Sequence, residues 1–238
     1  MFEQLREQAY EANMKLFKSN LVILTWGNAS VINRDLGYLA IKPSGVEYDS
    51  LRPEDIVIVD LEGNKISGEL TPSSDTATHI ELYKAFKTIG SVVHTHSSWA
   101  TSWAQAERPI PCYGTTHADC FYGEIPCTEK LQKKDVQECY EKNTGLEIVR
   151  CFKNKDPMNT PGVLCANHGV FTWGSNAMDA IKHAIVLEEV AKMAYRTESL
   201  NPNTEYLCAE IQDKHFYRKH GKGAYYGQDN ISKGGICL

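Results

Sequence analysis

Two hydrophobic periods divide the chain into expected helices and strands. Apolar residues spaced three and four apart predict a helix over residues 2–18, with Leu5, Ala9, Ala12 and Leu16 on one stripe. The same spacing predicts a long helix over residues 176–196, with Ile181 among its inward-facing positions. Further helices are expected over residues 73–87, 99–106 and about 205–219.

Short runs rich in β-branched and aromatic residues predict strands. They lie at residues 31–32, 38–41, 56–59, 91–94, 163–164 and 170–171, and turn residues separate them. Strands gather early in the chain and helices late, without regular alternation. This order favours a mixed or antiparallel sheet covered by helices. No repeat, low-complexity tract or linker interrupts the chain, so we expect one domain over residues 1–228.

Composition and charge narrow the possible partners. The chain has 238 residues, of which 42% are hydrophobic and 23% charged, and its net charge is −5. These values are ordinary for a globular protein and give no sign of a nucleic-acid-binding surface. Basic residues gather at residues 214–220, a short cluster that suits a local anionic ligand better than a polyanion.

Neither a membrane nor an oxidising compartment is expected. The longest apolar stretch, residues 21–24, is far too short to cross a bilayer, and acidic residues stand where a signal peptide would be basic. Eight cysteines are present without a Cys-x-x-Cys pair. We therefore expect reduced thiols in the cytoplasm.

Three histidines are the candidate metal ligands. His94 and His96 stand two apart at the end of an expected strand, so both imidazoles project on the same side. His168 lies in a tight turn between apolar runs, and Asp75 lies at an expected helix start. Residue spacing alone leaves packed histidines and a helix-capping Asp75 as alternatives. His-Glu-x-x-His is absent, which excludes the common metalloprotease motif.

A series of short motifs carries a family resemblance. In order they are Thr25-Trp26-Gly27-Asn28, Lys42-Pro43-Ser44-Gly45, Pro72-Ser73-Ser74-Asp75-Thr76, His94-Thr95-His96, Gly114-Thr115-Thr116-His117-Ala118-Asp119, His168-Gly169, Arg218-Lys219-His220-Gly221 and Tyr225-Tyr226-Gly227-Gln228. The chain resembles the class II (zinc) aldolase and epimerase family over residues 1 to about 228, and within it the L-ribulose-5-phosphate 4-epimerases.

The resemblance implies a fold and an assembly. The fold is a three-layer α/β/α sandwich with a central, predominantly antiparallel sheet. The assembly is a cyclic homotetramer with active sites between subunits, the tyrosine coming from the neighbour. Residues 229–238 lack a periodic pattern and are expected to form a disordered tail.

The resemblance also implies the site residues. Zinc would be bound by His94, His96 and His168, with Asp75 as the carboxylate partner, and manganese or cobalt suit such a site as well. Asp119 and Tyr226 would be the acid/base pair. The candidate contacts to a sugar phosphate are Gly27, Asn28, Lys42, Ser44, Gly45, Ser73, Ser74, Thr115 and His215. Without the resemblance, Pro43-Ser44-Gly45 is a plain turn, Asp119 a turn cap and Tyr226 a packed tail residue.

The implied reaction inverts C4 of a ketopentulose phosphate by breaking and re-forming the C3–C4 bond. A divalent ion stabilises the enediolate charge, and two groups exchange the C4 hydroxyl proton on opposite faces. Related aldolases carry a glutamate base after the serine pair, whereas this chain has Asp75. The alternatives are a fuculose- or rhamnulose-phosphate aldolase, an adducin-head-like interaction domain and a zinc hydrolase.

Overall fold

The computed structural model describes residues 2–221 and 223–226, and within them the strands form one antiparallel sheet. The strand order is β4-β3-β2-β1-β5-β7-β6, and every neighbouring pair is antiparallel. The strands are β1 (Asn28–Asn33), β2 (Tyr38–Ile41), β3 (Val57–Asp60), β4 (Lys65–Ser67), β5 (Ser91–Thr95), β6 (Gly162–Leu164) and β7 (Val170–Gly174). The expectation of an antiparallel sheet is confirmed.

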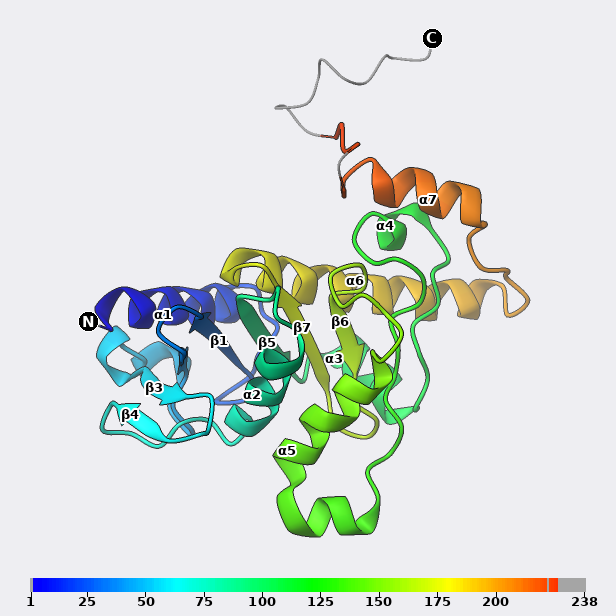
Figure 1. Ribbon diagram of the computed structural model, residues 1–238. Helices are drawn as coiled ribbons and strands as arrows, with labels where there is room; N and C mark the ends of the chain where they lie inside the picture. The colour runs from blue at the N-terminus through cyan, green and yellow to red at the C-terminus, as the bar shows by residue number, and fades with distance from the viewer. Residues whose placement is uncertain (1, 222, 227–238) are drawn as a thin grey trace.

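Helices cover both faces of the sheet. In Figure 1, α1 and α6 lie along one face, and α2 and α5 lie below the other. The α-helices are α1 (Glu3–Lys18), α2 (Thr76–Ala85), α3 (Ser98–Gln105), α4 (Thr115–Ala118), α5 (Lys133–Cys151), α6 (Ala177–Leu200) and α7 (Ala209–Tyr217), with 3-10 turns η1 (Tyr48–Ser50) and η2 (Pro53–Asp55). The three-layer α/β/α sandwich is therefore confirmed.

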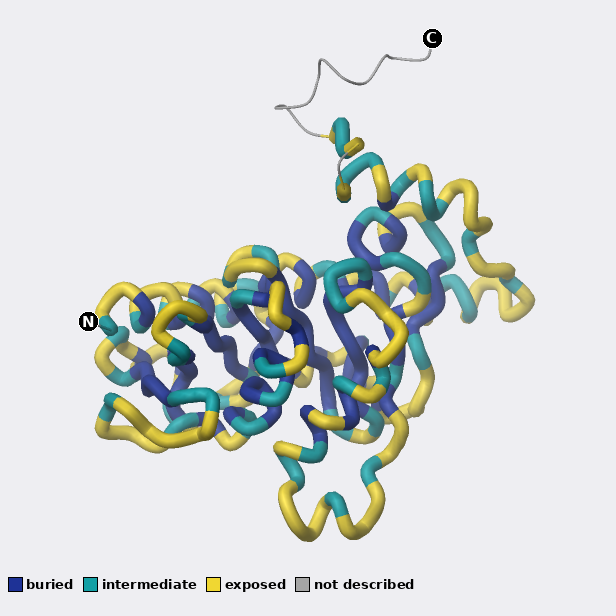
Figure 2. The backbone as a smooth tube through the Cα atoms, viewed as in Figure 1, coloured by how far each residue is buried: buried dark blue, intermediate teal, exposed yellow. Residues whose placement is uncertain are grey.

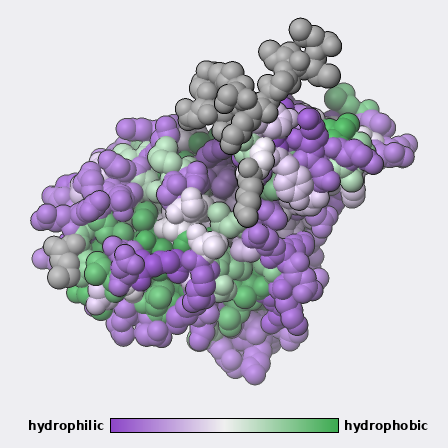
Figure 3. All heavy atoms as spheres, turned by 45° about the horizontal axis from the view of Figure 1, so that its top comes forward, coloured by the Kyte–Doolittle hydropathy of each residue, from purple (hydrophilic) through white to green (hydrophobic). Residues whose placement is uncertain are grey.

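Burial on both faces of the sheet explains why residues 56–59, at the start of β3, are all apolar. Val57 and Val59 pack with residues of α2 and α5, whereas Ile56 and Ile58 pack with residues of α1. Successive side chains of a strand point to opposite faces, so a sheet covered on both sides needs apolar residues at consecutive positions. Figure 2 shows the buried backbone concentrated in this sheet, and Figure 3 shows polar residues over much of one outer face.

Helix α5 is the main element that the sequence pattern does not predict. Its buried residues are Thr144, Gly145, Glu147 and Ile148, so only one of the four is a large apolar residue. A non-helical Cys139 also interrupts it. Gly145 lies so close to α2 that a Cβ there would stand 2.8 Å from Glu81 Cβ and 3.0 Å from Thr78 O. This close approach of two backbones accompanies the apolar contact that Ile148 makes in the core.

The last helix is shorter than expected and lies apart from the sheet. It spans Ala209–Tyr217, packs against α4, and of its nine residues only Phe216 is buried. Figure 2 shows its largely exposed backbone.

Three further expectations concern the ends, the thiols and the membrane. The predicted tail, residues 229–238, lies outside the described residues, as does Cys237. The seven described cysteines are free thiols. Among the described helices, none has both the length and the apolar character that a bilayer span requires.

Candidate active site and metal centre

Three neighbouring strands bring the predicted site residues together. β1, β5 and β7 are adjacent, and their register sets Asn28 opposite His94 and His94 opposite Phe171. His96 follows the end of β5, and His168 lies in the turn between β6 and β7. One ligand nitrogen from each of His94, His96 and His168 lies within 4.8 Å of the other two. Long-range strand pairing thus unites the histidines that the motifs singled out.

His94 is held in one orientation. Its Nδ1 donates to the Val170 carbonyl at 2.9 Å, and its ring stacks on Phe171 with centroids 4.3 Å apart. The Nε2 atom therefore carries the lone pair toward the site, 3.0 Å from His96 Nε2. Two nitrogens that bind one tetrahedral zinc at about 2.0–2.1 Å stand about 3.3 Å apart, so this spacing suits a shared ion.

Glycine is required on both sides of this histidine pair. A Cβ on Gly169 would meet Thr95 O at 2.7 Å and His96 Cδ2 at 2.9 Å. Gly27 has φ +75°, and a Cβ there would meet the His94 carbonyl at 2.8 Å. The turn motifs that contain these glycines therefore allow the backbone to approach the imidazoles closely.

Asp75 supplies a carboxylate at the start of α2. Asn28 Nδ2 donates to Asp75 Oδ2 at 2.8 Å, and this oxygen is 3.9 Å from His94 Nε2. Burial alone would raise the pKa of Asp75, but the nearby histidines and the Asn28 hydrogen bond lower it below its ordinary value. The carboxylate is thus available as a charged partner for a cation.

The donor set fits a divalent metal ion. Burial, followed by the neighbouring imidazoles, lowers the pKa of His168 to about 4, and the same causes lower that of His96. Neutral imidazoles are the form that binds metals. Asn28 Oδ1 and His168 Nδ1 are both buried without a hydrogen-bond partner among the described residues. Three imidazoles with an adjacent carboxylate are a set that zinc accepts while keeping a position open.

A pocket of about 320 Å³ opens beside these donors. It includes the predicted contacts from the first three motifs together with the histidines. Its lining residues are Thr25, Trp26, Gly27, Asn28, Lys42, Pro43, Ser44, Gly45, Ser73, Ser74, Asp75, His94, His96 and His168. Thr25, Trp26 and Pro43 are lining residues that the sequence-based set did not include.

The two serine-containing loops of the pocket are joined through the backbone. Ser73 N donates to the Lys42 carbonyl at 3.1 Å, and Ser44 N donates to the Thr71 carbonyl at 2.9 Å. Lys42 is 1% exposed, and its Nζ donates to the Val46 and Pro43 carbonyls. Burial lowers the pKa of Lys42 to about 8. The side chain therefore fastens the Ser44–Gly45 turn from within, a role that the sequence did not indicate.

Asp119 organises a second, separate cluster. Its carboxylate accepts from Arg218 Nη2 at 2.9 Å and contacts Lys219 Nζ and His215 Nδ1 at 3.0 Å each. Burial opposes ionisation, but the hydrogen bonds from Lys219, His215 and Arg218 keep the pKa of Asp119 below its ordinary value. Tyr226 lies over the two cations, its ring centroid 4.4 Å from Lys219 Nζ and 5.1 Å from the Arg218 guanidinium carbon.

This second cluster does not reach the metal pocket within one chain. Thr115, Asp119, His215 and Tyr226 are absent from the residues that line the pocket in the described part of the chain. The structure therefore brings Asp119, His215 and Tyr226 together with one another, but not with the histidines. Arg218 and Lys219, which also contact Asp119, appear in the sequence analysis within a basic run and a resemblance motif, without an assigned role.

Comparison with known proteins identifies the family. The model of the class II aldolase and adducin N-terminal domain matches residues 7–195. The chain belongs to the class II aldolase and adducin family. The match contains the three histidines, Asp75 and the serine-containing loops.

Solved class II aldolase structures share the fold. An L-fuculose 1-phosphate aldolase has 24% sequence identity and a TM-score of 0.79, covering 90% of this chain and 95% of its own. A putative aldolase/epimerase/decarboxylase from Klebsiella pneumoniae has 26% identity and a TM-score of 0.71, covering 90% and 99%. An L-fuculose-1-phosphate aldolase from Thermus thermophilus has 22% identity and a TM-score of 0.66, covering 85% and 98%.

Proposed function

We propose that this class II aldolase family member is a metal-dependent epimerase that interconverts L-ribulose 5-phosphate and D-xylulose 5-phosphate. The observation that carries the proposal is the placement of Asp75. Its carboxylate accepts a hydrogen bond from Asn28 and stands 3.9 Å from His94 Nε2. A short side chain committed in this way serves a cation better than it serves as a base at a substrate carbon. A glutamate base at this position would have supported an aldolase.

The proposed resident ion is zinc, with manganese and cobalt as alternatives. His94, His96 and His168 would hold it, with Asp75 as the carboxylate partner. When bound, such an ion supplies Lewis-acid stabilisation of negative charge that develops on substrate oxygens. Imidazoles carry no charge when they bind a metal, so Asp75 would be the one ligand that reduces the positive charge of the ion.

The remaining residues would hold the substrate and move protons. In the cleavage direction, a base takes the C4 hydroxyl proton, the C3–C4 bond breaks, and its electron pair forms an enediolate. The other fragment is glycolaldehyde phosphate, which turns over before the bond re-forms on its opposite face. Ser44, Gly45, Ser73 and Ser74 would anchor the phosphate through the serine hydroxyls and the backbone N–H groups of Gly45 and Ser74, which suit an anion.

Asp119 and Tyr226 are the proposed proton-transfer pair, supplied by a neighbouring copy of the chain. Within one chain their cluster lies apart from the pocket, on α4 and the segment after α7. Helix α7 has one buried residue among the nine that the structure describes, so it has surface free for a partner. A closed ring of four chains would place each cluster at the next chain's pocket.

An aldolase is the second candidate, because two of the structural neighbours above are L-fuculose 1-phosphate aldolases. One experiment separates the two candidates. The protein is incubated with L-ribulose 5-phosphate, and a coupled assay detects the D-xylulose 5-phosphate that forms. We expect product formation that a chelator abolishes and that zinc, manganese or cobalt restores. Absence of D-xylulose 5-phosphate together with cleavage of L-fuculose 1-phosphate would instead establish the aldolase.

A further inference from the structure

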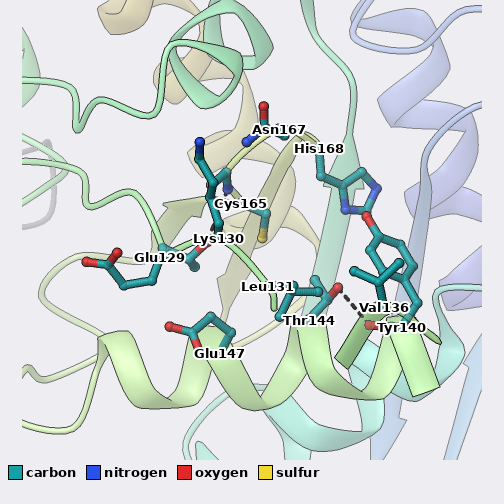
Figure 4. Close-up of a pocket in the computed structure, with 12 residues that line it drawn as sticks. Glu129, Lys130, Leu131, Val136, Tyr140, Thr144, Glu147, Cys165, Asn167 and His168 are labelled. Atoms are coloured by element: carbon teal, nitrogen blue, oxygen red, sulfur yellow. Dashed lines mark hydrogen bonds between the residues drawn. The ribbon is translucent and has the colours of Figure 1, made fainter. Parts of the chain in front are cut away.

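A second pocket lies behind His168, on the side of α5. It has a volume of about 180 Å³ and is lined by residues of α5, by residues 128–131 and by residues 165–168. Figure 4 shows His168 at one end of this pocket, with Tyr140, Val136 and Thr144 beside it. His168 lines both this pocket and the pocket that holds the candidate metal ligands. Its imidazole thus forms a wall between two spaces.

His168 lacks the support that His94 has. His94 Nδ1 donates to the Val170 carbonyl, which fixes its ring and its tautomer. His168 Nδ1 is buried and has no hydrogen-bond partner among the described residues. With Nε2 directed to the ion, as in His94 and His96, this Nδ1 carries a proton that needs an acceptor. Histidine ligands of metals nearly always donate that proton to a carboxylate, a carbonyl or a water molecule.

Tyr140 stands where such an acceptor is needed. Its ring centroid is 5.8 Å from that of His168, with 45° between the ring planes. In Figure 4 the Tyr140 hydroxyl points toward the imidazole. A tyrosine hydroxyl can accept a hydrogen bond. The pocket also has room for a bridging water molecule, which occupies about 30 Å³.

We propose that Tyr140 is a positioning residue for His168. Its hydroxyl accepts the Nδ1 proton through one water molecule in the pocket behind. This contact keeps the lone pair of His168 Nε2 aimed at the metal ion and prevents the ring from turning into the second pocket. The inference rests on the metal site of the proposed function, and it is independent of which sugar phosphate is converted.

The test compares Tyr140→Phe with Thr144→Val in the full chain. Both changes delete one hydroxyl in the same pocket, one helical turn apart on α5. Zinc affinity is measured by chelator competition, and the imidazole nitrogens are observed by NMR after labelling histidine with ¹⁵N. We expect Tyr140→Phe to weaken zinc binding by about 10- to 100-fold, and Thr144→Val to leave it near the wild-type value. The protected Nδ1 proton of His168 should be lost only in Tyr140→Phe.

Several outcomes would overturn the inference. Wild-type zinc affinity in Tyr140→Phe would mean that the ring merely packs against His168. Equal weakening in both variants would indicate general damage to the pocket, which far-ultraviolet circular dichroism would register separately as a loss of fold. A wild-type chain that binds no zinc would remove the metal site and this inference together, whereas failure of the epimerase assay alone would leave the inference standing.

Discussion

Gly169 lies directly against His94, near the end of β5, and His96, which follows it. The absence of a side chain lets the turn after His168 close onto Thr95 and His96, so that three imidazoles fit around one point. The His168-Gly169 motif is visible in the sequence, but the sequence does not show which atoms the glycine contacts. That contact depends on the pairing of β5 with β7, which joins residues more than 70 positions apart.

We predict that Gly169→Ala weakens zinc binding by about tenfold or more, because ligands must be held within about 0.5 Å of their productive positions. The new Cβ would stand 2.7 Å from Thr95 O, a backbone atom that has little freedom to move. Chelator competition measures the effect. Gly114→Ala is the matched control, because nothing lies within 4 Å of the Cβ it would add. Unchanged zinc affinity in Gly169→Ala would show that the turn yields easily.

The sequence predicts the residues that line the pocket better than it predicts the residues that support them. Asn28, Ser44, Asp75 and His94 lie in contiguous motifs, so they are readable without a structure. Tyr140 is different: its proposed role depends on a helix with one large apolar residue among its four buried ones, and no local pattern records its contact with His168.

At the scale of elements, a side chain of α1 completes the sheet where β2 stops. β2 ends at Ile41, opposite Ser30, so Ala29 at the start of β1 has no strand partner on that side. Asn13 replaces it: its amide donates to the Ala29 carbonyl at 2.9 Å and accepts from Ala29 N at 2.9 Å. The periodicity of α1 is correctly predicted, but a buried asparagine on its inner face is not explained by periodicity.

We predict that Asn13→Ala lowers the free energy of unfolding by about 2–4 kcal/mol, because it leaves two buried backbone groups of Ala29 without partners. Urea unfolding of the zinc-loaded chain measures the change. Asn33→Ala serves as the control, since Asn33 Oδ1 accepts from Leu36 N in an exposed turn; its cost should stay below about 1 kcal/mol. Equal costs for the two variants would contradict this account of the junction between α1 and β1.

At the scale of the whole molecule, the candidate chemistry is divided between two places. The histidines and serines lie where β1 begins and β5 ends. Asp119 and Tyr226 lie with α4 and the segment after α7. The antiparallel sheet and its covering helices follow from strand patterns that the sequence displays. The separation of the two clusters does not, because it depends on how α7 packs against α4 rather than against the sheet.

Mixing two inactive variants tests whether neighbouring chains share a site. His94→Asn removes a proposed metal ligand, and Asp119→Asn removes a proposed proton carrier. If each site combines one chain's histidines with the next chain's Asp119, random mixed tetramers should recover about one quarter of wild-type activity. Each variant alone should remain near zero. A mixture as inactive as its components, with exchange of chains verified by mass spectrometry, would show that every site is built from a single chain.

Helix α7 buries only Phe216 of its nine residues, and polar side-chain contacts such as that of His215 with Asp119 also join it to its own chain. If catalysis needs the cluster beside this helix, dilution should extinguish turnover before it releases the ion. A dissociated subunit would then retain its metal ion but have no catalytic activity. The cellular concentration of the protein would set its specific activity. Activity per chain would therefore rise with the concentration of the protein.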